Sequence, residues 1–324
     1  MMLSLLCLFA AASAMIAFTT SALVGVGLAA LRQRLAGLTP TAEARVLLGA
    51  ALLPMLTCAA TMAAALAPSF GWIVDHCVRG LDSHAHPHIC VDHHVSALPA
   101  PMLVLLAGLI VVRLAMGGAR LMHGAVTTAL TGRALARVAT TAGASGLRVL
   151  PLDEPQAFVV GVLRPMLFVT RGLVSDAHRE HLTAVVAHEH SHLRRRDPLR
   201  RAVATLALAF HLPGLAGWLD RRLARAHELA ADADAAHELG SRTLVARALV
   251  RLTRAHLQAP RMALAFAESD VEARVAALLD NRPRHDQPHR LVLLAGLGTL
   301  FIVVGSSADT VHHGVEIVLG LLGG

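Results

Sequence analysis

Ala187-His188-Glu189-His190-Ser191-His192 is the stretch from which the fold and chemistry of this chain are most directly predicted. It contains His-Glu-x-x-His. On a helix, positions four apart lie on one face with Cβ atoms roughly 5–6 Å apart. His188 and His192 can therefore bind one zinc ion together. Glu189 follows the first of them and is placed to act as the general base for an attacking water molecule, as in metallopeptidases.

The residues around this motif predict one helix over residues 176–196. Ser175 is a suitable N-cap, acidic residues occupy the first turn, and three arginines occupy the last turn. Asp197-Pro198 then ends or bends the helix. Because the chain contains 20 histidines, the motif can arise by chance. A zinc site therefore also requires a third ligand and a matching fold.

The composition indicates a membrane protein. The chain has 324 residues, of which 55% are hydrophobic, and its mean hydropathy is +0.58. All 29 basic residues are arginine, so chemistry that needs a Ser-x-x-Lys site or a P-loop lysine is excluded. No nucleic-acid-binding module accompanies the net charge of +7, and we expect no direct nucleic-acid binding. In an apolar chain, clustered arginines instead indicate the cytoplasmic ends of membrane helices.

Charge and hydropathy divide the chain into three parts and predict a mainly α-helical, polytopic membrane protein in the lipid bilayer. Residues 1–123 hold three apolar stretches long enough to cross a membrane. Residues 124–289 are expected to form a cytoplasmic zinc peptidase domain with a small β-sheet. Residues 290–324 are expected to form a last transmembrane helix and a short outer tail. The arginines that follow the first and third stretches place the middle part in the cytoplasm, at the plasma membrane of a bacterial cell.

The polar loop at residues 69–101 is expected outside the cytoplasm because it holds a single arginine. Its two cysteines, Cys77 and Cys90, can form a disulfide in an oxidising compartment, which would stabilise the fold by roughly 3 kcal/mol. The loop also holds six histidines and three aspartates. They indicate either a metal- or pH-sensing loop or a solvated loop of a His-rich protein, and we favour the second.

Several further elements are expected around the motif. Residues 102–122 form the third membrane span and residues 127–142 a separate helix. Strands are expected at residues 147–150, 156–163 and 166–170. The middle strand can lie at a sheet edge and accept an extended substrate, or it can be purely structural. Residues 199–219 are flanked by arginines at both ends, so we expect a bent helical pair rather than a single span. The last helix of the domain is expected at residues 268–281.

The motif Arg225-Ala226-His227-Glu228-Leu229-Ala230-Ala231-Asp232 resembles the Glu-x-x-x-Asp half of gluzincin peptidases. The resemblance implies that Glu228 is the third zinc ligand and leaves a fourth position open for water. It also implies that Asp232 hydrogen-bonds a ligand histidine, His188, and sets its tautomer. The alternative is an acidic pair on a solvated helix face.

The order of these elements is similar to that of the BlaR/MecR-type integral-membrane zinc metallopeptidases. The similarity rests on the membrane helices, the stretch Ala-Phe-Val-Val-Gly-Val-Leu-Arg-Pro at residues 157–165, and the paired zinc motifs. It implies a signal-transducing protease with one catalytic Zn²⁺. In such systems cleavage leads to the inactivation of a BlaI/MecI-like winged-helix repressor, so the partner would be a cytoplasmic or membrane-associated protein.

One departure bears on the signal. The antibiotic receptors of that type carry a penicillin-binding domain after the last span, whereas we expect this chain to lack one, and it has no lysine for its chemistry. Two alternatives to a signalling protease are an HtpX-like quality-control protease and a non-catalytic zinc-containing membrane sensor. The inducing signal, the cleavage site and the oligomeric state do not follow from the sequence.

Overall fold

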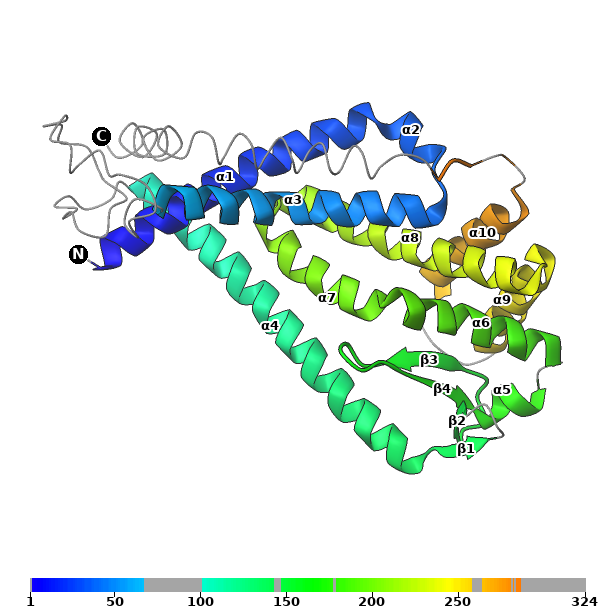
Figure 1. The fold of residues 1–324 in the computed structure, drawn as a ribbon. Helices are drawn as coiled ribbons and strands as arrows, with labels where there is room; N and C mark the ends of the chain where they lie inside the picture. Colours follow the sequence, from blue (N-terminus) through cyan, green and yellow to red (C-terminus); the bar gives the residue numbers. More distant parts are fainter. Residues whose placement is uncertain are drawn as a thin grey trace, which may run out of the picture.

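The computed structural model describes residues 2–66, 101–142, 147–176, 179–257, 264–280, 282 and 284–286. Within these ranges the chain is mainly α-helical with one four-stranded mixed sheet (Figure 1). The predicted disulfide between Cys77 and Cys90, the His-rich loop and the predicted last span lie outside the described residues.

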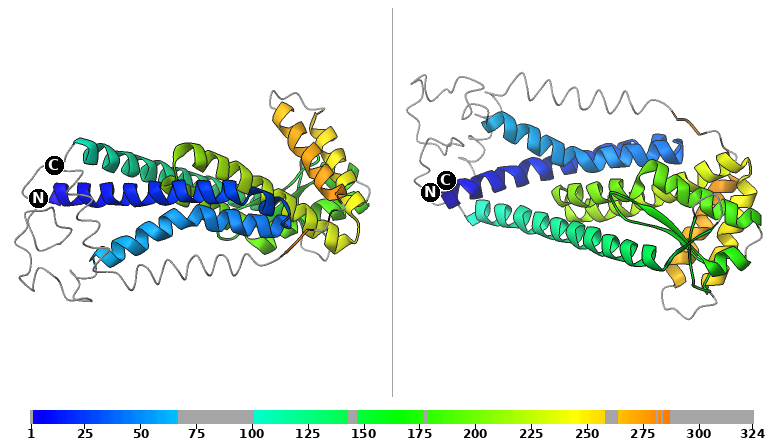
Figure 2. Two further views of the ribbon diagram at one scale, coloured as in Figure 1. Left: turned by 90° about the horizontal axis from the view of Figure 1, so that it is seen from above. Right: turned by 60° about the horizontal axis from the view of Figure 1, so that its bottom comes forward.

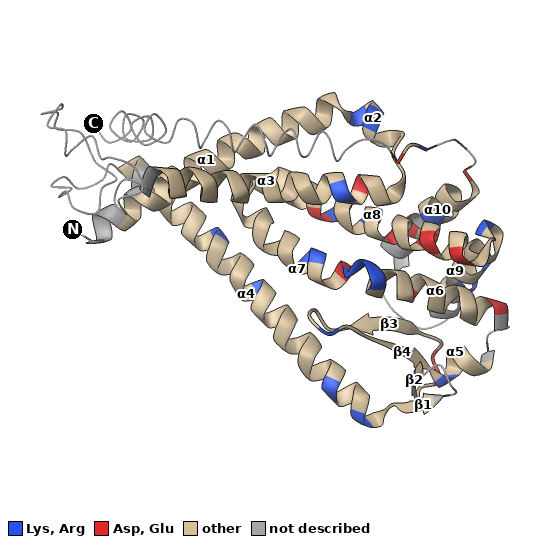
Figure 3. Cartoon of the chain, viewed as in Figure 1, with Lys and Arg blue, Asp and Glu red and all other residues tan. Residues whose placement is uncertain are grey.

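Among the described residues, three helices are long and apolar enough to cross a membrane. They are α1 (Met2–Ala30), α3 (Pro40–Leu66) and α4 (Pro101–Val138), and a short helix, α2 (Arg32–Ala36), joins the first two. In each apolar stretch a third or less of the residues are buried inside the protein. Charged residues are absent from α1 and from most of α3 (Figure 3). The exposed apolar surfaces of these helices are compatible with contact with lipid rather than water.

Helix α4 differs from the expectation of two helices at residues 102–122 and 127–142. It is one continuous helix, and its apolar stretch of 35 residues is about 52 Å long, well beyond the ~30 Å of a bilayer core. Helix α4 therefore extends from the membrane into the peptidase region. Residues 140–142 are a strand rather than a helix, because Thr140 and its neighbours pair with the strand at residues 147–149.

The sheet has the strand order β1-β2-β4-β3. Strand β1 (Thr140–Ala142) is antiparallel to β2 (Leu147–Leu150), β2 is parallel to β4 (Met166–Thr170), and β3 (Ala157–Val160) is antiparallel to β4. The predicted edge position of β3 is thus confirmed for the described strands. Gly161 allows the turn after β3, since it has φ of 111° and a Cβ there would lie 2.8 Å from the carbonyl oxygen of Arg164.

The helix with the His-Glu-x-x-His motif is shorter than predicted. Residues 171–176 form a separate helix, α5 (Arg171–Asp176), and the motif helix α6 runs over Arg179–Arg195. Ser175 is therefore not its N-cap, since the Ser175 hydroxyl donates to the carbonyl of Arg171 within α5. At the other end Arg196 adopts the left-handed conformation, with φ of 54°, and turns the chain sharply into α7 (Asp197–Ala207).

The predicted bent helical pair is confirmed. Helix α7 continues into a short 3₁₀ helix, η2 (Leu208–Phe210), and the chain reverses into α8 (Pro213–Leu239). This hairpin lies between α3 and α4 and contacts both (Figure 1). A core of mainly Leu, Val and Ala side chains from α1, α2, α3, α7, η2 and α8 joins the hairpin to the membrane helices.

A second core lies in the peptidase region. It packs β4, α5, α6 and α8 against α9 (Arg242–Leu257) and α10 (Leu264–Leu279). Seen from two further directions, α9 and α10 lie at the end of the molecule opposite the N-terminus (Figure 2). Helix α8 contributes to both cores, whereas α6 belongs to the second; these two helices carry the zinc-binding motifs.

Candidate metal centre

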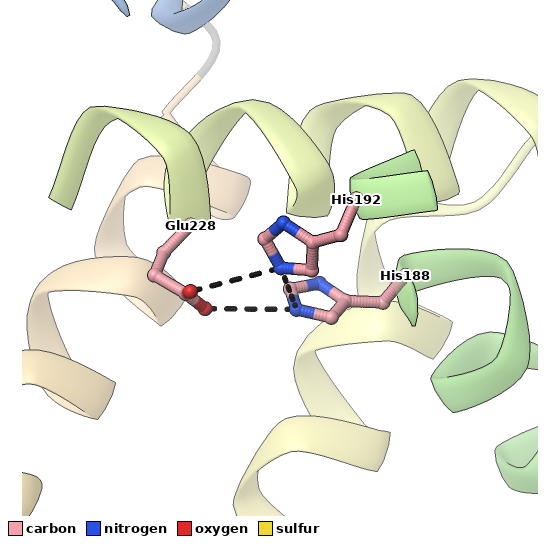
Figure 4. Close-up of side chains that lie close together, drawn as sticks. All are labelled: His188, His192 and Glu228. Carbon is pink, nitrogen blue, oxygen red and sulfur yellow. Dashed lines mark hydrogen bonds and ion pairs between the residues drawn. The ribbon is translucent and has the colours of Figure 1, made fainter. Parts of the chain in front are cut away.

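Helices α6 and α8 bring His188, His192 and Glu228 together (Figure 4). The Nε2 atoms of His188 and His192 lie 3.2 Å apart. Each is 3.6 Å from one carboxylate oxygen of Glu228, Oε2 for His188 and Oε1 for His192. Two ligands of one tetrahedral zinc ion, at about 2.0–2.1 Å from the metal, are separated by about 3.4 Å. The three donor atoms therefore have the spacing of a zinc site.

The two imidazoles are oriented by carboxylates on their far side. Nδ1 of His188 lies 2.9 Å from Oδ1 of Asp232, and Nδ1 of His192 lies 2.9 Å from Oδ2 of Asp197. Both aspartates are buried and accept the Nδ1–H proton. Carboxylate–histidine pairs of this kind set the tautomer and the ring orientation of metal ligands.

This arrangement tests whether the residues fit a metal ion. With Nδ1 donating, a neutral imidazole presents a lone pair at Nε2. In the neutral imidazoles, two such lone pairs 3.2 Å apart converge with the Glu228 carboxylate on one point, as ligands of a single cation do. Two histidine nitrogens and one carboxylate oxygen form a donor set that zinc prefers at catalytic sites, where a fourth position is open. The residues present therefore fit zinc.

Asp197 reaches His192 because of the turn at Arg196. The left-handed residue reverses the chain between α6 and α7, so that the first residue of α7 faces the last turn of α6. The Arg195 guanidinium lies 3.4 Å from the Asp197 carboxylate and also donates to the hydroxyl of Thr41, in the first turn of α3. The hydrogen bonding of His192 is thus connected directly to the start of a membrane helix.

Arg274, on α10, contacts two carboxylates of the site, those of Asp232 and Glu228. Its guanidinium donates two hydrogen bonds to Asp232, at 2.8 and 2.7 Å, and its Nη1 lies 3.1 Å from Oε2 of Glu228. The side chain is only 12% exposed, so these charges interact with little screening by solvent. Arg274 therefore orients both the predicted third ligand and the aspartate behind His188.

The carboxylates of the site are held in the ionised form. Burial alone would raise the pKa of Glu228, but His188 and Arg274 outweigh it and lower that pKa to about 2. For Asp232, burial is likewise outweighed by the hydrogen bonds from Arg274 and His188, and its pKa is also about 2. Burial lowers the pKa of His188, yet the hydrogen bonds to Asp232 and Glu228 raise it to about 9 in the metal-free site. The site thus attracts a positive charge.

Glu189 has a different environment from Glu228. It lies on α6 next to His188 and is partly buried. Burial raises its pKa above the ordinary value, and the positive charges of His188 and His192 offset this only in part. A carboxylate with a raised pKa takes up a proton more readily near neutral pH, which suits a general base. The two glutamates are therefore tuned in opposite directions.

The structure brings together four of the side chains that the sequence motifs predict: His188, His192, Glu228 and Asp232. His190 is exposed, away from the cluster. Two contributors were not predicted. Asp197 was read only as a helix boundary, although an acid five residues after the second histidine was a usable signal. Arg274 shares one helix face with Val271, Val275 and Leu278, and an arginine on an otherwise apolar face indicates a buried ion pair.

The profile of peptidase family M48 matches residues 128–289, which is half of the chain and includes every residue of this site. The chain belongs to peptidase family M48. M48 peptidases are zinc metalloproteases, in agreement with the donor set described above. With its three candidate membrane helices, the protein is a membrane-type M48 metallopeptidase.

A curated protein is similar to part of this M48 peptidase. The Protease HtpX homolog of Acidiphilium cryptum (strain JF-5) is 34% identical over 152 residues, which cover 36% of this chain and 53% of that protein. The chain thus spans about half the length of the curated relative it matches. No solved structure is significantly similar to the chain.

Proposed function

We propose that this M48 peptidase is a zinc-dependent endopeptidase that hydrolyses peptide bonds of cytoplasmic or membrane-associated proteins. The observation that carries the proposal is the convergence of His188, His192 and Glu228 with the partly buried Glu189 beside them. A structural zinc site needs no carboxylate in the position of a general base. The presence of Glu189 in that position favours a peptidase over a non-catalytic zinc-containing sensor.

The roles of the residues follow from their positions. Zinc bound by His188, His192 and Glu228 would supply Lewis acidity and lower the pKa of water toward about 7. Glu189 accepts a proton from the attacking water and delivers it to the leaving amine. Asp197 and Asp232 hold the two imidazoles with Nε2 directed at the site. Arg274 keeps Asp232 and Glu228 ionised and oriented.

Strand β3 supports binding of an extended substrate. It is at the edge of the sheet in the described structure and contacts α6. Gln156 accepts a hydrogen bond from the Thr170 amide, and pairing alternates along the antiparallel ladder. The backbone groups of Ala157 and Val159 therefore face away from β4, where a substrate strand can pair with them.

Two classes of substrate are compatible with this chemistry. Similarity to a protease named as an HtpX homolog favours quality control of membrane proteins. Similarity in helix order to BlaR/MecR-type proteins favours cleavage that inactivates a BlaI/MecI-like repressor. In both cases the arginines after the membrane helices support a cytoplasmic catalytic domain.

The experiment that tests the proposal uses membranes that contain either the native protein or the Glu189→Gln variant. In both samples, all newly formed protein N-termini are identified by sequencing. We expect new termini only with the native protein. A single dominant site in one DNA-binding protein would support the signalling role, and many sites in unfolded membrane proteins would support quality control. Identical termini in both samples, with zinc bound in both, would contradict a peptidase function.

A further inference from the structure

A polar cluster within the membrane region lies far from the metal centre. It forms where the α7–α8 hairpin reverses, at residues 208–212, which are called the hairpin bend below. The bend is contacted by all three candidate membrane helices. Its polar partners are Ser21 on α1, Ala51 on α3 and Arg113 on α4.

Arg113 binds the carbonyl groups of the bend. Its Nε donates to the carbonyl of Ala209 at 2.9 Å, and its Nη2 donates to those of Leu208 at 3.0 Å and His211 at 2.7 Å. The carbonyl of Leu208 also accepts the amide of His211, whereas carbonyl groups at the end of a helix in general have no partner within the helix. In a membrane both these carbonyls and a lone arginine are costly to leave unpaired. The arginine and the carbonyl groups therefore form their hydrogen bonds only when the hairpin packs against α4.

His211 connects the bend to the other two membrane helices. It is fully buried, as is Ser21. The Ser21 hydroxyl accepts the amide proton of Leu212 at 3.0 Å and lies 3.1 Å from Nδ1 of His211, to which it can donate its own proton. His211 then carries its proton on Nε2, which lies 3.1 Å from the carbonyl of Ala51. Every polar atom of this chain of bonds has a partner.

The membrane helices pack so closely around the bend that the hairpin has little room to shift. A Cβ at Gly117, one turn after Arg113, would lie 3.3 Å from Cβ of Ala209. A Cβ at Gly25, one turn after Ser21, would lie 3.3 Å from the side chain of Leu215. The two glycines thus allow α4 and α1 to approach the hairpin closely on either side.

The two legs of the hairpin lead from this cluster to the metal centre. Helix α7 begins with Asp197, which orients His192. Along this helix, Asp197 lies about 16 Å from the bend. Helix α8 carries Glu228 about 24 Å of helix from the bend. A shift of the bend against α1, α3 and α4 would therefore move Glu228, the predicted third ligand, together with Asp197, the carboxylate that orients His192.

We propose that Ser21, Arg113 and His211 form an intramembrane clamp that positions the predicted ligand Glu228 and the carboxylate of Asp197 that orients His192, so that the packing of the three candidate membrane helices sets the geometry of the zinc site. The inference rests on the proposed function for its importance to catalysis. Its test through metal binding is independent of peptide hydrolysis.

The test uses the full-length protein purified in detergent, with Arg113→Gln as the main variant. Arg113→Lys, which keeps a donor, is the conservative variant, and Arg120→Gln, an exposed arginine two turns farther along α4, is the matched control. Zinc affinity is measured by competition with chelators. The geometry of the site is followed by the visible absorption of bound Co²⁺.

We expect Arg113→Gln to change the Co²⁺ spectrum and to weaken zinc binding about ten-fold, because displacement of Asp197 acts on His192 as loss of an outer partner of a metal ligand does. Arg113→Lys should recover part of the affinity, and Arg120→Gln should match the native protein. Peptide hydrolysis should show a lower kcat with little change in KM, because the substrate-binding strand β3 is not part of the hairpin.

Native zinc affinity and an unchanged Co²⁺ spectrum in a folded Arg113→Gln protein would overturn the proposal. If Arg113→Gln fails to accumulate, Ser21→Ala replaces it, since that change leaves the arginine in place and removes only the hydroxyl. A native spectrum and affinity in Ser21→Ala would then overturn it. If Glu189→Gln shows that the protein is not a peptidase, the metal-binding result still decides the clamp.

Discussion

At the scale of the residue, the metal centre depends on pairs of side chains with distinct tasks. His188 and His192 each face the site with one nitrogen and a buried carboxylate with the other. Against the effect of burial, the pKa of Asp197 is lowered by its hydrogen bond with His192 and further by Arg195, and that of Asp232 is lowered by Arg274 and His188. The ligands are thus oriented by groups that do not themselves bind the metal.

Asp197→Asn tests the task assigned to that carboxylate. The substitution keeps the shape and removes the charge that holds His192 as the Nδ1–H tautomer. We expect zinc affinity to fall about 10- to 100-fold, measured by chelator competition. Asp220→Asn, an exposed aspartate on α8, is the control and should leave the affinity unchanged. Equal affinities in the two variants would contradict the role of Asp197.

Arg274→Gln tests the ion pair behind the site. Asp232 is 2% exposed and would lose both hydrogen bonds from the guanidinium. Breaking a buried pair by removal of one partner costs about 3–5 kcal/mol. We expect a clearly lower thermal transition of the metal-free protein, whereas the exposed Arg247→Gln should change it little. A transition equal to that of the native protein would show that the pair does not stabilise the fold.

The sequence predicted the ligands better than their partners, for a physical reason. His188 and His192 are related by helix geometry alone, and Glu228 with Asp232 repeats that spacing on a second helix. Asp197 reaches His192 only because Arg196 adopts a left-handed conformation, which its residue type does not favour. Arg274 belongs to a helix 42 residues after Asp232, so tertiary packing alone brings them together.

At the scale of the element, helices and strands with a strong hydrophobic pattern were mostly predicted, whereas elements decided by tertiary contacts were not. The first two apolar helices, the bent hairpin and the strand at residues 166–170 were predicted, whereas α4 was predicted as two helices and is one. Strand β1 was predicted as helix, since its pairing with β2 is decided by a contact outside its own residues. The separation of α5 from α6 was missed because caps and acids near Ser175 indicated an uninterrupted helix start.

Strand β3 offers a test of the proposed substrate position. Val159→Pro removes an amide that faces away from β4, and Val159→Ala removes side-chain packing but keeps the amide. Loss of one hydrogen bond of about 1 kcal/mol should reduce kcat/KM roughly five-fold in the proline variant beyond the effect of alanine. Zinc content should be equal in both. Equal kcat/KM values would contradict pairing of substrate with β3.

At the scale of the whole molecule, one hairpin connects the membrane helices with the metal centre. Arginines are concentrated where the apolar helices end, and the acidic residues of the described chain lie toward the peptidase region (Figure 3). On this distribution we propose a catalytic domain in the cytoplasm. The hairpin is the route by which we propose that membrane packing reaches the zinc ligands.

Topology can be tested by labelling single cysteines in intact cells with a membrane-impermeant reagent. We expect a cysteine retained at position 77 to react and one introduced at Arg133 to react only after lysis, because arginines remain on the cytoplasmic side. The other native cysteines are replaced in both proteins. The reverse pattern would contradict both the orientation and a cytoplasmic substrate.

The central claim is that one zinc ion and Glu189 together hydrolyse peptide bonds. The most direct measurement is the zinc content of the purified native protein and of Glu189→Gln, with cleavage of an unfolded protein substrate measured on the same samples. We expect one zinc per chain in both proteins and a rate at least about 100-fold lower in the variant. Equal cleavage by two zinc-loaded proteins, or absence of bound zinc from both, would contradict the claim.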